Sequence, residues 1–221
     1  MIAFENAGKA YRDRRNRIQW VFRNLNATFP DRKNHAILAP RGQGKTTLMN
    51  TISGNDTVSE GEIRRWGRVS YAMDFRAHLS QRLTGRQNLR FLADVYGVNF
   101  SDALEFCSAF SEMGRQIDLP LRSLSNQARG RFSASALLSL GFSHILIDDA
   151  INVGDVKFRK KCINYLMDNA GRLTVLIATS DADYAARMCN SASVLHQGSL
   201  AFFDNFSDAA QAFAEINKIY V

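Results

Sequence analysis

The chain has 221 residues, of which 46% are hydrophobic and 22% are charged, an ordinary composition for a globular protein. Its formal net charge of +7 favours an anionic partner, which is a nucleotide, a nucleic acid or an anionic membrane face, although scattered Lys and Arg also fit a surface charged for solubility. No apolar run approaches the roughly 20 residues that cross a bilayer, and the first residues do not resemble a signal peptide, so we expect a soluble chain.

The first third of the chain predicts strands around one strand–loop–helix unit. Residues 1–29 alternate apolar and polar side chains around a basic turn at 12–17, which predicts antiparallel strands. Residues 35–39 predict a short buried strand, and a helix follows from about Gly44 to Ser53. Residues 61–73 predict two more short strands.

The remainder predicts helices first and then strands. Apolar residues spaced by three and four positions predict a helix around 88–96, and two more helices are expected near 102–114 and 127–141. Further strands are predicted at 145–147, 174–178, 192–195 and 199–203. A helix is expected between the first two of these strands, and another begins at about Ser207. This alternation predicts a parallel sheet with a helical insert between residues 80 and 140.

The segment between the strand predicted at 35–39 and the helix that follows it has the layout of a phosphate-binding loop. It reads Ala39-Pro40-Arg41-Gly42-Gln43-Gly44-Lys45-Thr46-Thr47. Backbone N–H groups of such a turn and of the following helix point at a polyphosphate, and the helix dipole favours its negative charge. We expect Lys45 to reach the β- and γ-phosphates and the Thr46 hydroxyl to hold Mg²⁺. The pattern has glycine at its first position, where this chain has Ala39.

An apolar strand that ends in two acids supplies the second part of a nucleotide site. Asp148 is expected at the carboxyl end of the strand, where an open α/β sheet presents ligands, and would hold the water shell of Mg²⁺. Asp149 follows in the place of a general base that activates the attacking water. The alternative is a buried strand followed by an Asp-Asp turn. The phosphate loop about a hundred residues upstream favours the functional interpretation.

Several outlying segments, in one order with the phosphate loop, carry a family resemblance. They are Phe4-Glu5-Asn6 with Lys9-Ala10-Tyr11, Val21 to Asn26, Leu83 to Phe91, Leu146 to Asp155, and Val194 to Gly198. Over nearly its whole length the chain resembles the ATP-binding subunits of ABC transporters, most closely those that export capsular polysaccharide. The resemblance implies an α/β fold: an ABC-type P-loop ATPase core with a mixed sheet and flanking helices, an antiparallel β subdomain, and an inserted helical subdomain. It implies a core of about 1–80 and 142–221 and a helical subdomain of about 81–141.

The resemblance also implies ATP and Mg²⁺ as ligands and assigns residues to them. The metal would be held by Thr46 and Asp148, and the catalytic positions would be Asp149 and Ser180. Tyr11 takes the place of the aromatic that stacks on adenine, although an ordinary strand aromatic is the alternative. The implied ATP-binding residues are Tyr11, Arg41, Gly42, Gln43, Gly44, Lys45, Thr46, Thr47, Ser125 and Asp155.

The chain departs from this family at residues that do chemistry. If Ala39 must adopt a positive φ, its β-carbon costs about 1 kcal/mol. Gln127 replaces a glycine of the signature sequence, which aligns with Ser125 to Ala128. Asp149 is one methylene shorter than the family's glutamate, and Ser180 replaces its histidine. Binding of nucleotide is therefore a firmer expectation than fast turnover.

Other residues receive no site. Cys107, Cys162 and Cys189 lack C-x-x-C spacing and fit reduced, mostly buried thiols of a cytoplasmic protein. The spacing of His35, His78 and His144 predicts no metal site, and His196 is expected on a hairpin surface. The loop that would face the membrane subunit, Tyr71 to Phe75, has no glutamine, although Gln81 is nearby.

Three functional hypotheses follow. The first is a transporter motor in which two copies clamp ATP and drive an integral membrane permease, at the cytoplasmic face of the bacterial inner membrane. The second is a subunit that binds ATP as a structural or regulatory ligand beside an active paralogue. The third, a nucleic-acid-associated protein, is disfavoured because the chain has no compact basic-aromatic stripe, so no nucleic acid is expected as a partner.

Overall fold

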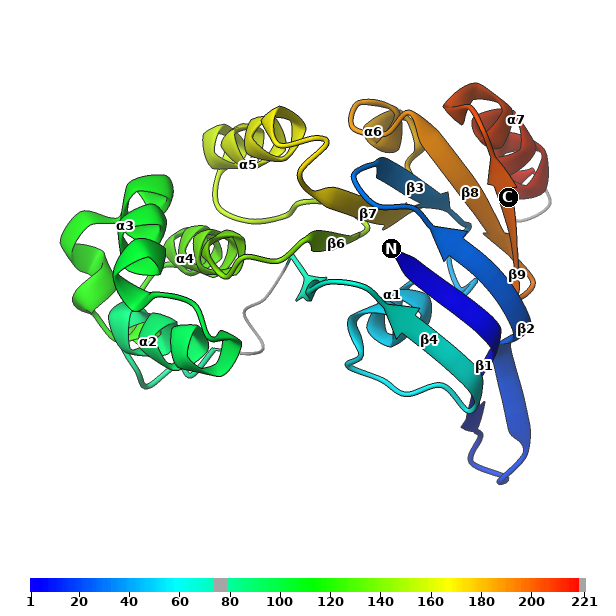
Figure 1. Ribbon diagram of the computed structural model, residues 1–221, viewed down its shortest axis with the longest axis horizontal. Helices are drawn as coiled ribbons and strands as arrows, with labels where there is room; N and C mark the ends of the chain where they lie inside the picture. Colours follow the sequence, from blue (N-terminus) through cyan, green and yellow to red (C-terminus); the bar gives the residue numbers. More distant parts are fainter. Residues whose placement is uncertain (74–78, 219–221) are drawn as a thin grey trace. The chain divides into compact units, whose positions relative to one another are not determined.

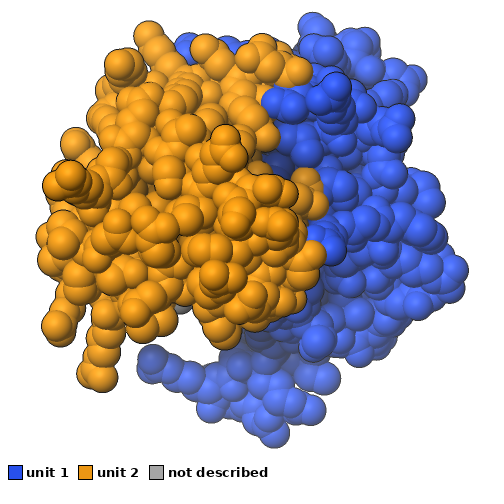
Figure 2. Space-filling model, turned by 60° about the vertical axis from the view of Figure 1, so that its left-hand side comes forward, with its two compact units in different colours: residues 1–72, 143–150, 169–221 blue, residues 73–142, 151–168 orange. Residues whose placement is uncertain are grey.

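The computed structural model describes residues 1–73 and 79–218. The chain divides into two compact units, coloured separately in Figure 2. The first unit comprises residues 1–72, 143–150 and 169–221, and the second comprises 73–142 and 151–168. The helices expected within 81–141 thus lie in the second unit. This unit also contains the helix that follows the strand ending at Asp148.

A three-stranded antiparallel sheet occupies one side of the first unit (Figure 1). Its order is β2-β1-β4, with β1 at Ile2–Arg12, β2 at Ile18–Phe29 and β4 at Glu60–Arg65. The antiparallel strands predicted around the basic turn are confirmed. Its turn is closed by the Asp13 carboxylate, which accepts hydrogen bonds from the backbone N–H groups of Arg15 and Arg17 at 2.8 and 2.9 Å.

The second sheet of this unit has six strands in the order β5-β6-β7-β3-β8-β9. The strands are β3 (Asn34–Leu38), β5 (Val69–Ala72), β6 (His144–Asp148), β7 (Thr174–Thr179), β8 (Ser191–His196) and β9 (Ser199–Phe203). All pairs are parallel except β8 with β9, so the expected mixed sheet is confirmed. The segment 61–73 does form two strands, but β4 and β5 belong to different sheets.

Helix α1 (Lys45–Ser53) packs between the two sheets. One hydrophobic core joins it to both, with Leu48 and Ile52 of the helix fully buried beside Phe4 of β1 and Leu176 of β7. Two further helices, α6 (Ala182–Ala186) and α7 (Phe206–Asn217), lie on the other face of the six-stranded sheet (Figure 1). The five-residue α6 was not predicted, because it is too short to show a helical period.

The second unit is helical. It contains α2 (Gly85–Tyr96), α3 (Phe100–Ser111), α4 (Asn126–Ser139) and α5 (Val156–Asp168), with 3₁₀ turns at Gly114–Asp118 and Leu121–Ser123. Thr84 and Gln87 form a capping box at the start of α2. Helix α3 ends earlier than predicted, at Ser111, because Glu112 adopts a left-handed conformation with φ 57°.

The three cysteines are buried and unpaired in disulfides, as expected. Burial raises the pKa of each thiol to about 12, which makes all three unreactive at neutral pH.

Candidate functional site

The phosphate loop joins the end of β3 to the start of α1, and two of its glycines adopt left-handed conformations. Gly42 has φ 79° and Gly44, the N-cap of α1, has φ 88°. A β-carbon at Gly44 would also collide with the side chain of Val21 on β2. Glycine at position 44 is therefore required both by its backbone angle and by the close approach of β2.

Lys45 is the first residue of α1, directly after this loop. The residue is only 8% exposed, and Nζ donates hydrogen bonds of 3.1 Å to the carbonyl oxygens of Ala39 and Pro40. An ammonium group has three donor protons, so the third can serve a ligand in the loop. The loop backbone thus holds a buried positive charge at the N-terminus of α1, where the helix dipole also favours an anion.

Ala39 fits this loop without backbone strain. It is fully buried, its N–H donates to the carbonyl oxygen of Thr179 at 3.1 Å, and it is not among the described residues with positive φ. The condition for a penalty of about 1 kcal/mol is therefore not met, because an alanine costs this energy only in the left-handed region.

The register of the parallel strands brings the predicted catalytic residues to the same sheet edge. Leu38 of β3 is level with Thr179 of β7, and Asp148 of β6 is level with Ala178. The phosphate loop, both acids and Ser180 consequently lie at or directly after the carboxyl ends of three neighbouring strands, which is where open α/β sheets bind ligands.

The carboxylate of Asp148 has the features of a metal ligand. Its Oδ1 atom is buried and accepts no hydrogen bond from the described residues. Burial, more than the nearby Asp149, raises the pKa of Asp148, whereas a hydrogen bond with Thr46 and the charge of Lys45 oppose this shift. A divalent cation would supply the missing partner and favour the charged form.

The residues present fit a Mg²⁺ ion that is also bound by phosphate and water better than they fit a metal site built from protein side chains alone. The described part of the chain contains no group of three or more His, Cys, Asp and Glu side chains that could hold a metal. Thr46 and Asp148 would therefore share the ion with phosphate oxygens and water, as is usual for Mg²⁺ beside a nucleotide. His35, His144 and His196 belong to no such group, and His78 lies outside the described residues.

Asp149 is exposed and has an unusual backbone. Its φ is 66°, and its N–H donates a 2.7 Å hydrogen bond to the carbonyl oxygen of Ala178. Asp and Asn are the non-glycine residues that adopt this left-handed region most readily. The shorter acid thus suits the local backbone, a preference that the sequence alone does not reveal.

Beside the phosphate loop lies a cavity of about 620 Å³. Tyr11 of β1 lines it together with Gly44 and Thr47, so the structure brings the predicted base-stacking residue to the nucleotide loop. The turn between β8 and β9 also lines it, and the N–H of Gln197 donates to Oε1 of Gln43 at 2.9 Å. Sequence reasoning missed this turn as part of the site, because about 150 residues separate it from the loop that it contacts.

Ser125 and Asp155 belong to the second unit, where each caps a helix. The Ser125 hydroxyl accepts from the N–H of Ala128 at 3.1 Å at the start of α4. Asp155 accepts from the N–H of Phe158 at 2.9 Å and forms an ion pair with Arg131. Both side chains therefore have structural partners, and the predicted contacts with ATP remain predictions for them.

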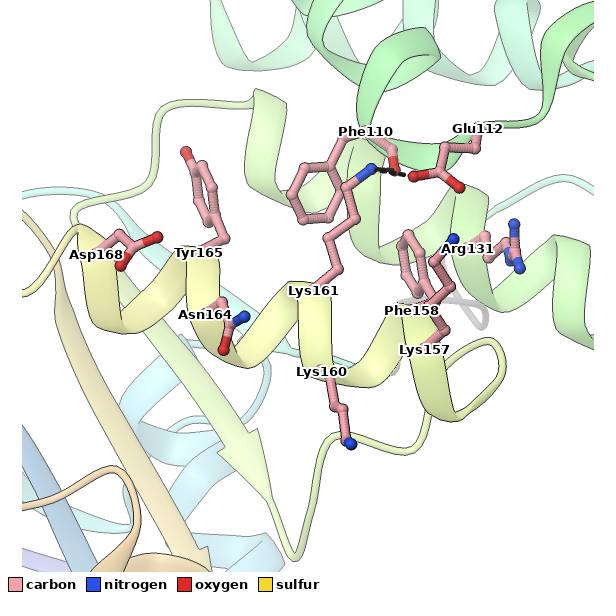
Figure 3. Close-up of a pocket in the computed structure, with 10 residues that line it drawn as sticks. All are labelled: Phe110, Glu112, Arg131, Lys157, Phe158, Lys160, Lys161, Asn164, Tyr165 and Asp168. Carbon is pink, nitrogen blue, oxygen red and sulfur yellow. Dashed lines mark hydrogen bonds and ion pairs between the residues drawn. The ribbon is translucent and has the colours of Figure 1, made fainter.

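The second unit has a cavity of its own, of about 490 Å³, which the sequence did not indicate (Figure 3). Lys161 of α5 points from the helix to its neighbours, donating to the carbonyl oxygen of Phe110 at 2.9 Å and to Glu112 at 2.6 Å. In the loop expected to face a membrane subunit, Tyr71 and Ala72 end β5, whereas Asp74 and Phe75 lie outside the described residues.

Residues 22–152 match the family described as "ABC transporter". The chain belongs to this ABC transporter family. It is 33% identical to the polysialic acid transport ATP-binding protein KpsT of Escherichia coli, over 95% of this chain and 96% of that protein. It is 28% identical to the capsule polysaccharide export ATP-binding protein CtrD of Neisseria meningitidis, over 96% and 98% of the two chains.

Solved ABC structures share the fold. A dimeric ATP-binding cassette in a post-hydrolysis state with ADP and Pi has a TM-score of 0.76 and 22% identity, over 90% of this chain and 96% of that one. The expected ABC-type fold is therefore confirmed. Over the part of the chain that the structure describes, no helix of this ABC protein has the length and apolar character needed to cross a membrane.

Proposed function

We propose that the chain is the ATP-binding subunit of an ABC exporter of capsular or related polysaccharide, and that it binds and slowly hydrolyses ATP to drive a partner permease. The proposal rests on one observation above others: a buried Lys45 in the phosphate loop faces the same sheet edge as an acid whose buried oxygen has no described hydrogen-bond partner. The two named relatives match nearly the whole chain, and their names support polysaccharide as the exported substrate.

Each residue at this edge has a separate role in the proposed hydrolysis. Lys45 and the N-terminus of α1 bind the phosphates, and Thr46 and Asp148 would hold Mg²⁺, which neutralises charge on the β- and γ-phosphates. Asp149 takes a proton from the attacking water, and Ser180 orients the γ-phosphate. The short reach of Asp149 and the missing imidazole at position 180 both slow this step, since a base displaced by about 1 Å can lose on the order of a hundredfold in rate.

A second copy of the chain, or a paralogous subunit, would complete each site with its own Ser125 and Asp155. The dimeric cassette with the same fold supports such an assembly. Through the permease, the chain would be peripheral at the cytoplasmic face of the bacterial inner membrane.

Steady-state ATP hydrolysis by the purified chain, alone and with its permease, tests this function. The wild type is expected to exceed a Lys45→Ala variant, which keeps the fold but loses the buried charge of the phosphate loop. Equal rates for the two proteins would exclude the motor. ATP binding without hydrolysis would instead favour the regulatory subunit paired with an active paralogue.

A further inference from the structure

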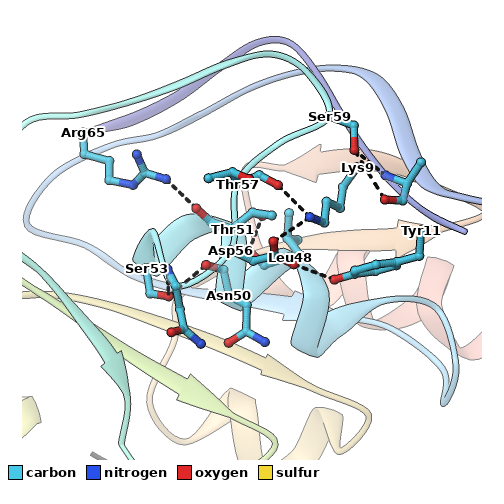
Figure 4. Close-up of polar contacts among 12 residues, drawn as sticks. Lys9, Tyr11, Leu48, Asn50, Thr51, Ser53, Asp56, Thr57, Ser59 and Arg65 are labelled. Atoms are coloured by element: carbon cyan, nitrogen blue, oxygen red, sulfur yellow. Dashed lines mark hydrogen bonds and ion pairs between the residues drawn. The ribbon is translucent and has the colours of Figure 1, made fainter.

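Lys9 and Tyr11 of β1 form a polar cluster with Asp56, which lies just after α1 (Figure 4). Lys9 Nζ donates to Asp56 Oδ1 at 2.6 Å and to the carbonyl oxygen of Thr57 at 2.7 Å. The Tyr11 hydroxyl donates to Asp56 Oδ2 at 2.7 Å. One carboxylate therefore holds both a buried ammonium group and the end of the aromatic ring.

The cluster explains why a lysine is buried here. Lys9 is only 7% exposed, a burial that an unpaired ammonium group would not tolerate. Its Nζ also lies 4.8 Å from the centroid of the Tyr11 ring, in the geometry of a cation–π contact. Tyr11 itself is 45% exposed and lines the cavity beside the phosphate loop. Thus the ring is fixed by its hydroxyl and by a cation, while much of its surface stays open.

Asp56 lies just after the C-terminus of α1. It follows Gly54, the left-handed C-cap of α1, and its own N–H donates to the carbonyl oxygen of Asn50 at 3.1 Å. Arg65 of β4 donates to the carbonyl oxygen of Ile52 at 2.7 Å and so anchors the last turn of the helix. The position of Asp56 is therefore set by elements that are independent of Tyr11.

We propose that Asp56 and Lys9 are positioning residues for the base of the bound nucleotide, and that they act through the ring of Tyr11. The inference rests on the proposed function, because it assumes that the chain binds ATP beside Tyr11. A ring that is already immobilised loses little freedom when a base stacks on it, so removing its supports weakens binding of the base and leaves the phosphates unaffected.

The test compares two ligands, Mg-ATP and Mg-tripolyphosphate, by calorimetric titration of the full chain. Tripolyphosphate occupies the phosphate loop but has no base. Asp56→Asn is expected to weaken ATP binding on the order of tenfold, a fraction of the value of one stacked base, and to leave tripolyphosphate binding unchanged. Lys9→Met, which replaces the buried charge with an apolar chain of similar length, is expected to act in the same direction. Asp118→Asn, which breaks an exposed carboxylate–arginine pair elsewhere, is the matched control.

A double-mutant cycle separates positioning from general stability. In a Tyr11→Ala background, Asp56→Asn is expected to have no further effect on ATP binding. An equal loss of both ligands, an unchanged ratio of the two affinities, or a full effect of Asp56→Asn without the ring would each overturn this inference alone. If the folded wild type binds tripolyphosphate and ATP equally, Tyr11 contacts no base and the inference also fails. If it binds neither, the proposed function itself fails.

Discussion

The backbone conformation at Asp149 and the proposed hydrolysis reaction favour different side chains at this position. Its left-handed φ of 66° favours Asp over Glu, whereas the reaction proposed for this site favours the longer acid. The departure from the family that the sequence exposes thus has a local physical reason. Ala39 is the contrasting case, because its ordinary φ makes the loss of glycine harmless to the loop.

Exchange of Asp149 for its amide tests its role as the base. Asp149→Asn keeps the shape and the tolerance of a left-handed backbone, so the free energy of unfolding and the affinity for ATP are expected to stay unchanged. The rate of hydrolysis is expected to fall about a hundredfold or more, which is the usual effect of losing a general base. An unchanged rate would show that another group activates the water.

Lengthening the same side chain has two opposed effects. Asp149→Glu is expected to speed hydrolysis because the carboxylate reaches further, and to lower the free energy of unfolding by about 1 kcal/mol because Glu is less tolerant of positive φ. Thermal unfolding and single-turnover rates measure the two effects separately. A slower variant of unchanged stability would contradict both expectations.

His35 makes stability depend on pH. Its ring is buried between Ser191 and Ser193, with ring nitrogen to hydroxyl distances of 3.0 Å, and burial, with a smaller effect of Lys33, lowers its pKa to about 4. Because the unfolded chain binds this proton more tightly, the stabilisation is complete above the ordinary pKa of 6.5 and is lost as the pH falls towards 4. Denaturant unfolding is expected to show a loss of about 2 kcal/mol from this residue between pH 8 and pH 5.

The control for this pH dependence is His35→Gln, which keeps hydrogen-bonding groups but does not titrate. His144, whose pKa is also lowered to about 4, contributes a similar slope to both proteins. The difference between the two slopes therefore reports His35. Equal slopes would show that His35 is not buried in its neutral form.

At the scale of elements, the sequence predicts local structure well and pairing poorly. Hydrophobic period and capping residues identified most helices and strands, since both depend on neighbours in the chain. The pattern of 61–73 shows two strands but cannot show that β4 pairs with β1 whereas β5 pairs with β6. The same limit applies to the site: the loop from Ala39 to Thr47 is local and was predicted, but the turn at Gln197 reaches it only through the order of the sheet.

Close packing of α4 depends on one glycine. A β-carbon at Gly130 would lie 2.7 Å from the backbone nitrogen of Gly154, and neither backbone can yield cheaply. Gly→Ala normally stabilises a helix by about 1 kcal/mol, but Gly130→Ala is expected to destabilise the chain by about 1–3 kcal/mol through overpacking. Thermal unfolding measures the change, and Gln127→Ala on the exposed face of α4 is the control. A stabilised Gly130→Ala variant would show that this contact is loose.

At the scale of the whole molecule, the residues proposed to act on the nucleotide are divided between the two units, although both proposed catalytic residues, Asp149 and Ser180, lie in the first. Lys45, Asp148 and Asp149 belong to the first, whereas Ser125 and Asp155 belong to the second. In the proposed dimer the second chain supplies Ser125 and Asp155, so the complete site is expected only when two chains associate around nucleotide. In the proposed motor, association and ATP binding are therefore coupled.

Sedimentation velocity tests this coupling. Asp149→Asn with Mg-ATP is expected to sediment as a dimer and to dissociate when ATP is replaced by ADP, because only ATP supplies a γ-phosphate to the second chain. Lys45→Ala is expected to remain monomeric with either nucleotide. A dimer whose population ignores the nucleotide would argue for a constitutive assembly.

The length of helix α1 determines how far Asp56 lies along the chain from the phosphate loop. The loop that holds phosphate precedes its first residue, and the loop that carries Asp56 follows its last, so nine residues, about 13 Å of helix, separate the two. One added residue would lengthen this separation by about 1.5 Å and rotate Asp56 by about 100° around the helix axis. Such an insertion would leave the phosphate loop complete and remove the support of Tyr11. The number of residues in α1 thus sets the position of Asp56 relative to the phosphate loop.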